Sequence, residues 1–286
     1  MRAALLTITA LMAFAANSVF CRIALQAGAI DAASFTTVRL ASGALMLLFI
    51  AGISSGRAMP KLKLGSTTAG SWTSGTLLFL YAVPFSFAYL SLTAGTGALI
   101  LFGCVQATMM SVGLASGERL DVLQCGGLVL AVAGLVYLVR PGLAAPPPHA
   151  AALMAIAGGA WGAYSLRGRG ASRPLVDTAG NFLRSVPLAV VVSAIALSRI
   201  HASRSGVLLA VASGALASGL GYVVWYAALR SLTATRAAIV QLAVPVLAAV
   251  GGVLFLGERI SARLVIAAAM ILGGIMLALS RRRSRT

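Results

Sequence analysis

The chain of 286 residues combines a high apolar content with few charges: 60% of its residues are hydrophobic, 9% are charged, and the mean hydropathy is +0.99. A soluble domain carries about 25% charged residues, so this chain has too few to cover a water-facing surface. The composition therefore argues against a soluble enzyme and against a free nucleic-acid-binding module. A membrane-spanning helix needs roughly 20 apolar residues, and the chain has room for about ten of them.

Ten apolar segments, bounded by Gly, Pro and charged residues, follow one another along the chain. They lie near 3–25, 33–54, 68–91, 95–116, 121–139, 149–167, 176–197, 206–229, 235–256 and 261–280. The fold class that they predict is an all-α integral membrane protein with ten transmembrane helices. The proline run at 146–148 separates two halves, so we expect a first five-helix repeat over 1–143 and a second over 144–286.

The net charge of +17 has two interpretations. In a soluble chain it would favour nucleic acid, whereas in a membrane chain the same residues set topology and contact anionic lipid headgroups. We adopt the second and expect no nucleic-acid partner. The connections on the N-terminal side hold most Lys and Arg residues: Arg2, Arg57, Lys61, Lys63, Arg119, Arg167, Arg169, Arg173, Arg230, Arg236, Arg281, Arg282, Arg283 and Arg285, against Arg22, Arg140, Arg199, Arg204, Arg259 and Arg263 on the other side. Because positive loops stay inside, we expect both termini in the cytoplasm of a bacterial-type inner (plasma) membrane.

The two halves repeat in sequence. Ser91-Leu92-Thr93-Ala94 matches Ser231-Leu232-Thr233-Ala234, and Gly117-Glu118-Arg119 matches Gly257-Glu258-Arg259 at the same spacing. Arg39 matches Arg184 more weakly. Five helices is an odd number, so equivalent helices of the two halves must cross the membrane in opposite directions. Such an inverted repeat is typical of alternating-access carriers with a site near the midplane, although duplication for stability alone is the alternative.

The beginning of the chain has some features of a cleavable signal peptide, with Arg2 before an apolar run and small residues near Ala13. We expect a retained first helix instead, because Phe14, Ser18 and Arg22 have counterparts in the sixth segment. Cys21, Cys104 and Cys125 give neither a disulfide framework nor a metal-ligand spacing. We therefore expect no metal and no cofactor.

The candidate binding groups are the polar and aromatic residues inside the apolar segments. An unpaired amide in hydrocarbon costs several kcal/mol, so Asn17, Gln106 and Gln241 must face other helices or a wet cavity. Deep aromatic residues suit a cavity for a flat or amphipathic metabolite. The substrate-binding candidates are Phe14, Asn17, Tyr81, Gln106, Trp161, Tyr164, Tyr222 and Gln241. Helix-to-helix hydrogen bonding is the alternative role for the amides.

Other residues of the segments have less direct roles. Tyr89, Trp225 and Tyr226 lie near segment ends, and we assign them to the aromatic belt at the membrane interface. Arg39 and Arg184 can hold a substrate carboxylate, but we favour snorkelling or a structural salt bridge. Pro84, Pro187 and Pro245 are predicted to be gating or kink positions, because proline removes a backbone hydrogen bond.

The acidic residues Asp31, Glu118, Asp121, Asp177 and Glu258 all lie at segment ends. Proton-coupled carriers commonly use a buried carboxylate as the relay, so the sequence favours facilitated transport without proton coupling. We expect the paired residues Glu118-Arg119 and Glu258-Arg259 to act as structural caps and loop charges, with gating as a second role.

The sequence resembles the drug/metabolite transporter superfamily in its ten-helix, two-repeat (EamA-type) form. The resemblance is carried by Phe14-Ala15-Ala16-Asn17-Ser18 and Trp161-Gly162-Ala163-Tyr164-Ser165, by Val38-Arg39, and by the two Gly-Glu-Arg motifs. It covers about residues 5–280 and implies an exporter of small metabolites, most similar to bacterial exporters of aromatic and other amino acids. In one departure, Pro245 stands where the first half has Val105, so we expect the two halves to bend unequally.

The expected function is export of small organic metabolites, most of all amino acids including aromatic ones, by alternating access. The expected partners are therefore a small-molecule substrate and the lipid bilayer, and a monomer suffices. A proton-coupled drug or nucleotide-type exporter of the same superfamily is the alternative. A channel and an integral membrane enzyme are weaker alternatives, and the enzyme would need a Ser/His/Asp or metal-ligand set that no apolar segment holds.

Overall fold

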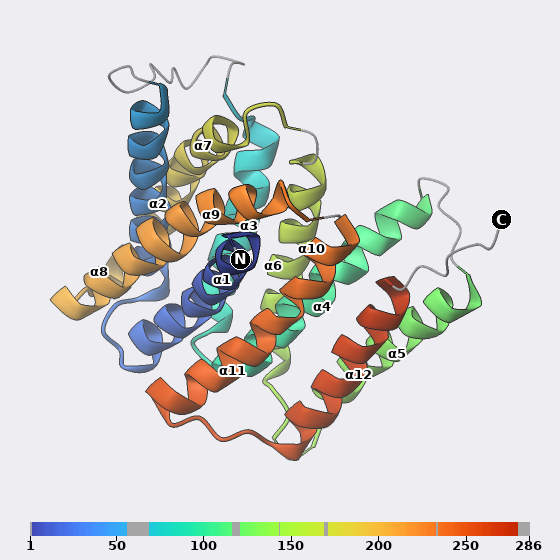
Figure 1. The fold of residues 1–286 in the computed structure, drawn as a ribbon. Helices are drawn as coiled ribbons and strands as arrows, with labels where there is room; N and C mark the ends of the chain where they lie inside the picture. Colours follow the sequence, from blue (N-terminus) through green and yellow to red (C-terminus); the bar gives the residue numbers. More distant parts are fainter. Residues whose placement is uncertain are drawn as a thin grey trace.

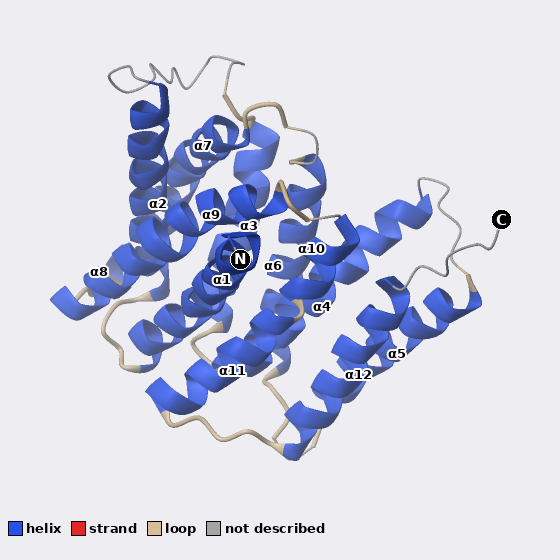
Figure 2. Cartoon of the chain, viewed as in Figure 1, coloured by secondary structure: helices blue, strands red, loops and turns tan. Residues whose placement is uncertain are grey.

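A computed structural model describes residues 2–55, 69–115, 121–142, 144–168, 171–232 and 234–279, and these residues form helices joined by short connections (Figures 1 and 2). The first half contains α1 (Arg2–Gln26), α2 (Ala32–Ser55), α3 (Trp72–Ala88), α4 (Ala94–Ala115) and α5 (Val122–Val139). The second half contains α6 (Pro148–Arg167), α7 (Pro174–Ile195), the short 3-10 turn Leu197–Arg199, α8 (Arg204–Val211), a π-helical stretch (Ala212–Leu220), α9 (Gly221–Leu229), α10 (Ala234–Gln241), α11 (Ala243–Leu256) and α12 (Ala262–Leu279).

Eight helical segments of this described part are long and apolar enough to cross a membrane. One of them joins α8, the π-helical stretch and α9, and another joins the end of α10 to α11. The shorter apolar helix α3 and the 20-residue α6 complete the ten segments that the sequence predicts. The all-helical membrane fold class is therefore confirmed.

Helices of one half pack mainly against helices of the other half. α2 packs on α7, and α5 packs on α12 at one edge of the molecule (Figure 1). α3 and α4 both contact α6, just as the segment of α8 to α9 and helix α11 both contact α1. These main contacts are thus the same when equivalent helices of the two halves are exchanged.

Small residues permit this packing. A side chain on Gly127 of α5 would lie 2.5 Å from the Gly274 carbonyl oxygen of α12, and one on Gly274 would lie 2.5 Å from the Gly127 oxygen. The backbones of α5 and α12 therefore touch, as is common where membrane helices associate through small residues.

Two of the segments in the second half are irregular. The segment from Arg204 to Leu229 is π-helical over Ala212–Leu220, and a side chain at Gly214 within this stretch would collide with the Arg39 carbonyl oxygen. The next segment breaks at Leu242, between α10 and α11. Proline lacks a backbone N–H and its ring clashes with the carbonyl four residues earlier, so Pro245 explains a break next to Gln241. The equivalent helix α4 is unbroken, which confirms the unequal bending of the halves.

One end of the molecule is tied together by its connections. The backbone N–H of Asp31 donates to the His201 carbonyl oxygen (3.0 Å), and the N–H of Ser203 donates to the Ala29 oxygen (2.8 Å). The Asp31 carboxylate accepts hydrogen bonds from the N–H groups of Ser34 (2.9 Å) and His201 (3.1 Å). Although partial burial raises the pKa of Asp31, these hydrogen bonds outweigh it and hold the pKa below its ordinary value. The loop before α2 is thereby attached to the loop before α8.

Candidate functional site

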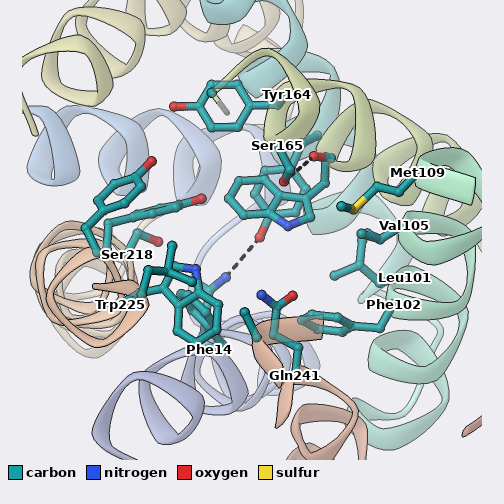
Figure 3. A pocket seen from close by; sticks show the side chains of 18 of the residues that line it. Phe14, Leu101, Phe102, Val105, Met109, Tyr164, Ser165, Ser218, Trp225 and Gln241 are labelled. Atoms are coloured by element: carbon teal, nitrogen blue, oxygen red, sulfur yellow. Dashed lines mark hydrogen bonds between the residues drawn. The ribbon is translucent and has the colours of Figure 1, made fainter. Parts of the chain in front are cut away.

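A cavity of about 490 Å³ lies among α1, α3, α4, α6, α9, α10 and the π-helical stretch. In Figure 3, Tyr164 and Ser165 lie on one side of it, Phe14 and Gln241 on the opposite side, and Leu101, Val105 and Met109 of α4 along one flank. We call it the central cavity. It is lined by residues of both halves.

All eight substrate-binding candidates from the sequence line the central cavity: Phe14, Asn17, Tyr81, Gln106, Trp161, Tyr164, Tyr222 and Gln241. Their contact with a substrate stays a prediction. The Trp161 ring lies at the centre of the aromatic set, with its centroid 4.9 Å from Tyr81 and 5.4 Å from both Tyr164 and Tyr222. Rings at these distances form a cohesive aromatic wall.

The assignment of Tyr89, Trp225 and Tyr226 to a membrane belt is wrong. Tyr89 is fully buried and donates a hydrogen bond to the Ala94 carbonyl oxygen (3.3 Å). Trp225 and Tyr226 both line the central cavity. Tyr89 follows α3, and Trp225 and Tyr226 lie in α9; counting from the segment ends does not show whether such residues face lipid or the interior of the protein.

The amides differ in their surroundings. Asn17 bonds to other helices: its Nδ2 donates to the Tyr81 hydroxyl (3.2 Å), and its Oδ1 accepts from the Ser213 hydroxyl (2.5 Å). The side chains of Gln106 and Gln241 form no hydrogen bond with the described part of the chain, and both line the cavity. Helix-to-helix bonding therefore accounts for Asn17 but not for the two glutamines.

Among the described residues that line the central cavity, none is Asp, Glu, Lys, Arg or His. A positive charge nevertheless lies directly behind it. Arg39 is only 2% exposed, donates from Nη2 to the Tyr81 hydroxyl (2.8 Å), and places its guanidinium carbon 5.1 Å from the Tyr81 ring centroid and 4.7 Å from that of Phe85. Its Nε and Nη1 atoms are buried and have no hydrogen-bond partner in the described residues.

Arg39 therefore neither snorkels to the interface nor pairs with a carboxylate of the described chain, and both of these predictions are wrong. Arg184 does not snorkel either, because it is 4% exposed and donates from Nη1 to the carbonyl oxygens of Ala69 (2.6 Å) and Gly180 (3.0 Å). These bonds attach α7 to the residues that precede α3. The sequence alone could not separate the two arginines, because their partners come from distant helices.

The central cavity extends to one end of the molecule. Its lining includes Gly168 and Ala171 of the connection between α6 and α7, and Pro174 at the beginning of α7. A second hollow of about 240 Å³ shares these three residues and adds polar groups, among them Ser71 and Asp177. An aromatic-lined cavity that meets a polar vestibule is suited to admit a solute from this end, which we call the open end.

At the opposite end, a salt bridge joins several parts of the chain. Arg22 of α1 and Glu258, after α11, form a salt bridge of 3.1 Å, and their side chains are only 12% and 9% exposed. Arg22 also donates to the carbonyl oxygens of Tyr89 (2.9 Å) and Leu90 (3.1 Å), and Glu258 accepts from the Ala94 N–H (2.9 Å). The pair thus joins α1, the turn between α3 and α4, and the end of α11. We call this the closed end.

Glu258 caps the beginning of α4, as the sequence predicts, and Arg259 is exposed. Their counterparts Glu118 and Arg119 lie outside the described residues, as does Arg169, the counterpart of Arg22 in the second half.

The predicted gate prolines occupy three different settings. Pro84 lies inside α3 and Pro187 inside α7, and both helices continue through them. Pro245 lies three residues after the break at Leu242. Only this third proline interrupts its segment, and gating by any of the three stays a prediction.

Comparisons with known proteins agree with this architecture. Residues 149–280 match the model of the EamA-like transporter family. An uncharacterized protein of Pseudomonas aeruginosa is 49% identical over 284 residues, which span 99% of this chain and 96% of that protein. A solved crystal structure shares the fold, with a TM-score of 0.67, 22% sequence identity and coverage of 96% of both chains. The chain therefore belongs to the EamA-like transporter family of the drug/metabolite transporter superfamily, and it is a multi-pass membrane transporter rather than an enzyme.

Proposed function

We propose that this transporter exports small organic metabolites, chiefly amino acids including aromatic ones, by alternating access. The observation that carries the proposal is the central cavity itself. Its described lining residues carry no charge, aromatic rings surround Trp161 in its wall, and its volume of about 490 Å³ lies in the range of small-molecule sites. A flat or apolar side chain suits such a wall.

Alternating access is supported by the difference between the two ends. The cavity extends to the α6–α7 connection, whereas the Arg22–Glu258 pair joins helices at the other end. Repeats over 1–143 and 144–286 with opposite orientation would let each half adopt the arrangement of the other, so that the closed end opens as the open end closes. With both termini in the cytoplasm of a bacterial inner membrane, the open end faces the cytoplasm, where an exporter loads its substrate.

We further propose that transport is facilitated rather than proton-coupled. The described acids have other roles: Asp31 caps α2, Asp121 caps α5, and Glu258 pairs with Arg22. Asp177 lines the second hollow but not the central cavity. Among the described residues that line the central cavity, no carboxylate is therefore placed to carry a proton with the substrate.

Counterflow in proteoliposomes tests the proposal. Vesicles loaded with unlabelled L-phenylalanine should accumulate labelled L-phenylalanine with saturation, and Trp161→Ala should lower this rate about tenfold because a central aromatic contact is lost. Expression and the melting temperature of the variant serve as controls. Collapsing a pH gradient should leave the initial rate unchanged.

Three results would redirect the proposal. A rate that rises with concentration without saturation would indicate a channel. A loss of transport on collapsing the pH gradient would favour the proton-coupled alternative. Counterflow of nucleosides or cationic drugs in place of amino acids would overturn the substrate class.

A further inference from the structure

We infer that the central cavity contains a carboxylate-binding subsite, made by Tyr81, Asn17 and Trp161 and supported from behind by Arg39. The inference rests on the proposed function and goes further, because it names the chemical group by which a substrate is recognised. It makes an aromatic or apolar monocarboxylate the preferred ligand, and it makes the amino group of an amino acid dispensable.

The first step is the orientation of the Asn17 amide. The contact between Asn17 and Ser213 measures 2.5 Å, and the contact between Asn17 and Tyr81 measures 3.2 Å. O–H···O hydrogen bonds are typically shorter than N–H···O bonds. The short contact is therefore the Ser213 hydroxyl donating to Oδ1, and the longer one is Nδ2 donating to the Tyr81 oxygen. In the reverse orientation the amide nitrogen would face Ser213 and the oxygen would face Tyr81, so the contact with Ser213 would be expected to be the longer one.

The second step concerns the Tyr81 hydroxyl proton. A tyrosine oxygen accepts two hydrogen bonds and donates one. Both acceptor positions of Tyr81 are occupied, by Arg39 Nη2 at 2.8 Å and by Asn17 Nδ2 at 3.2 Å. Its own proton has no acceptor in the described residues, and Tyr81 lines the cavity. Hydrogen bonds received by an oxygen strengthen the one that it donates, so Tyr81 offers the cavity a strong donor.

The neighbouring groups add donors and no acceptor. The second hydrogen of Asn17 Nδ2 is unused, and its Oδ1 is already bonded to Ser213. The Trp161 indole N–H, which can only donate, makes no hydrogen bond with the described chain, and its ring lies 4.9 Å from that of Tyr81. A group that meets three donors must be an acceptor, and an ionised carboxylate is acceptor-only.

The charge of Arg39 selects an anion over a neutral carbonyl. Its guanidinium is buried behind Tyr81 and Phe85 without a carboxylate partner in the described structure. An uncompensated buried charge is costly, and a bound carboxylate on the other side of Tyr81 would compensate it. Arg39 is thus a positioning residue, because it acts through the Tyr81 hydroxyl and does not itself line the cavity.

Three ligands with the same ring distinguish the contribution of the carboxylate to binding from that of the amino group. L-Phenylalanine has both, 3-phenylpropanoate has only the carboxylate, and 2-phenylethylamine has only the amine. Each is measured as an inhibitor of L-phenylalanine counterflow and by the shift that it produces in the melting temperature of the purified full-length protein. We expect the two carboxylates to act within about threefold of each other, and the amine to be at least about tenfold weaker.

The variants test the residues. Tyr81→Phe removes only the hydroxyl and should weaken 3-phenylpropanoate about ten- to a hundredfold, the value of a hydrogen bond to a charged group, while the weak binding of 2-phenylethylamine stays unchanged. Arg39→Gln should likewise weaken the binding of 3-phenylpropanoate relative to that of 2-phenylethylamine. Tyr137→Phe is the matched control, because Tyr137 lies near Arg140 and Arg263, away from the cavity.

The outcomes distinguish the two proposals. Phenylalanine counterflow together with equal inhibition by the amine would overturn the subsite and leave the proposed function intact. A melting shift with 3-phenylpropanoate that Tyr81→Phe abolishes, without any counterflow, would support the subsite and overturn amino-acid transport. If none of the three ligands shifts the melting temperature or inhibits transport, the subsite is overturned as well. If Arg39→Gln does not fold, the Tyr81→Phe comparison decides the question alone.

Discussion

The two ends of the central cavity are held together by different kinds of interaction. At the closed end, Arg22 and Glu258 form one charged pair that links three parts of the chain, and Asp31 attaches the loop before α2 to His201. At the open end, several separate side chains bond to the loop before α3: Asn181 accepts from the Ser71 N–H, Asp177 accepts from the Gly70 N–H, and Arg184 donates to the Ala69 carbonyl oxygen. We expect that an end joined by one ion pair can be released by breaking that pair, whereas separate hydrogen bonds to a loop must be broken one by one.

The largest effect should follow from breaking the pair. Glu258→Gln keeps a hydrogen-bond acceptor for the Ala94 N–H but leaves Arg22 without its counter-charge, at a cost of about 1–3 kcal/mol for a partly buried pair. The closed end should then open more often. Cys21, next to Arg22 and fully buried, reports this opening, and in a background with Cys104→Ala and Cys125→Ser its rate of maleimide labelling should rise about tenfold.

Arg259→Gln is the matched control for this experiment, because Arg259 is the adjacent residue and is exposed. It should leave the Cys21 labelling rate unchanged. Equal labelling in Glu258→Gln and in the parent protein would show that the ion pair does not hold this end shut.

An intermediate effect is expected at the open end. Asn181→Ala removes the acceptor of the Ser71 N–H (2.9 Å) and the donor to the Tyr164 hydroxyl (3.2 Å). Asn181 is 7% exposed, so the loss should lower the free energy of unfolding by about 1–2 kcal/mol, measured by thermal unfolding in detergent. Cys21 labelling of the folded protein should not rise. An increase equal to that of Glu258→Gln would mean that the two ends are not independent.

The smallest effect concerns Asp31 at the closed end. Its pKa is lowered in the folded protein by hydrogen bonds from Ser34 and His201, which outweigh the opposing effect of burial. The ionised carboxylate therefore stabilises the fold above its ordinary pKa, and this contribution disappears as the pH falls through the lowered folded value. Asp31→Asn should cost about 0.5–1 kcal/mol at pH 7, and the difference from the parent should shrink on acidification. A difference in melting temperature that is constant with pH would contradict this account.

The sequence predicted the all-helical membrane fold and the residues around the cavity for a clear reason. Apolar runs bounded by charge determine where helices cross a bilayer, and polar or aromatic residues within them, such as Asn17 and Trp161, must face protein or water. The internal repeat also indicated which helices of the two halves are equivalent. These features are local or periodic, so they can be read without coordinates.

What the sequence could not supply depends on partners that are distant in the chain. The belt assignment of Trp225 rested on its nearness to a segment end, which does not show that Trp225 faces the cavity between helices. The difference between Arg39 and Arg184 depends on whether a hydroxyl of α3 or the carbonyl of Ala69 lies within reach. The pairing of Arg22 with Glu258 joins positions 236 residues apart, which no local pattern reveals.

The break at Leu242 affects the conformational equilibrium of the transporter without substrate. A duplicated carrier with identical halves would have equal energy facing either side, and its direction would be set entirely by the solute gradient. Pro245 interrupts one half only, while α4 is continuous. The inward-facing and outward-facing states are therefore not equivalent. We expect the cavity of the empty protein to face one side of the bilayer in most molecules.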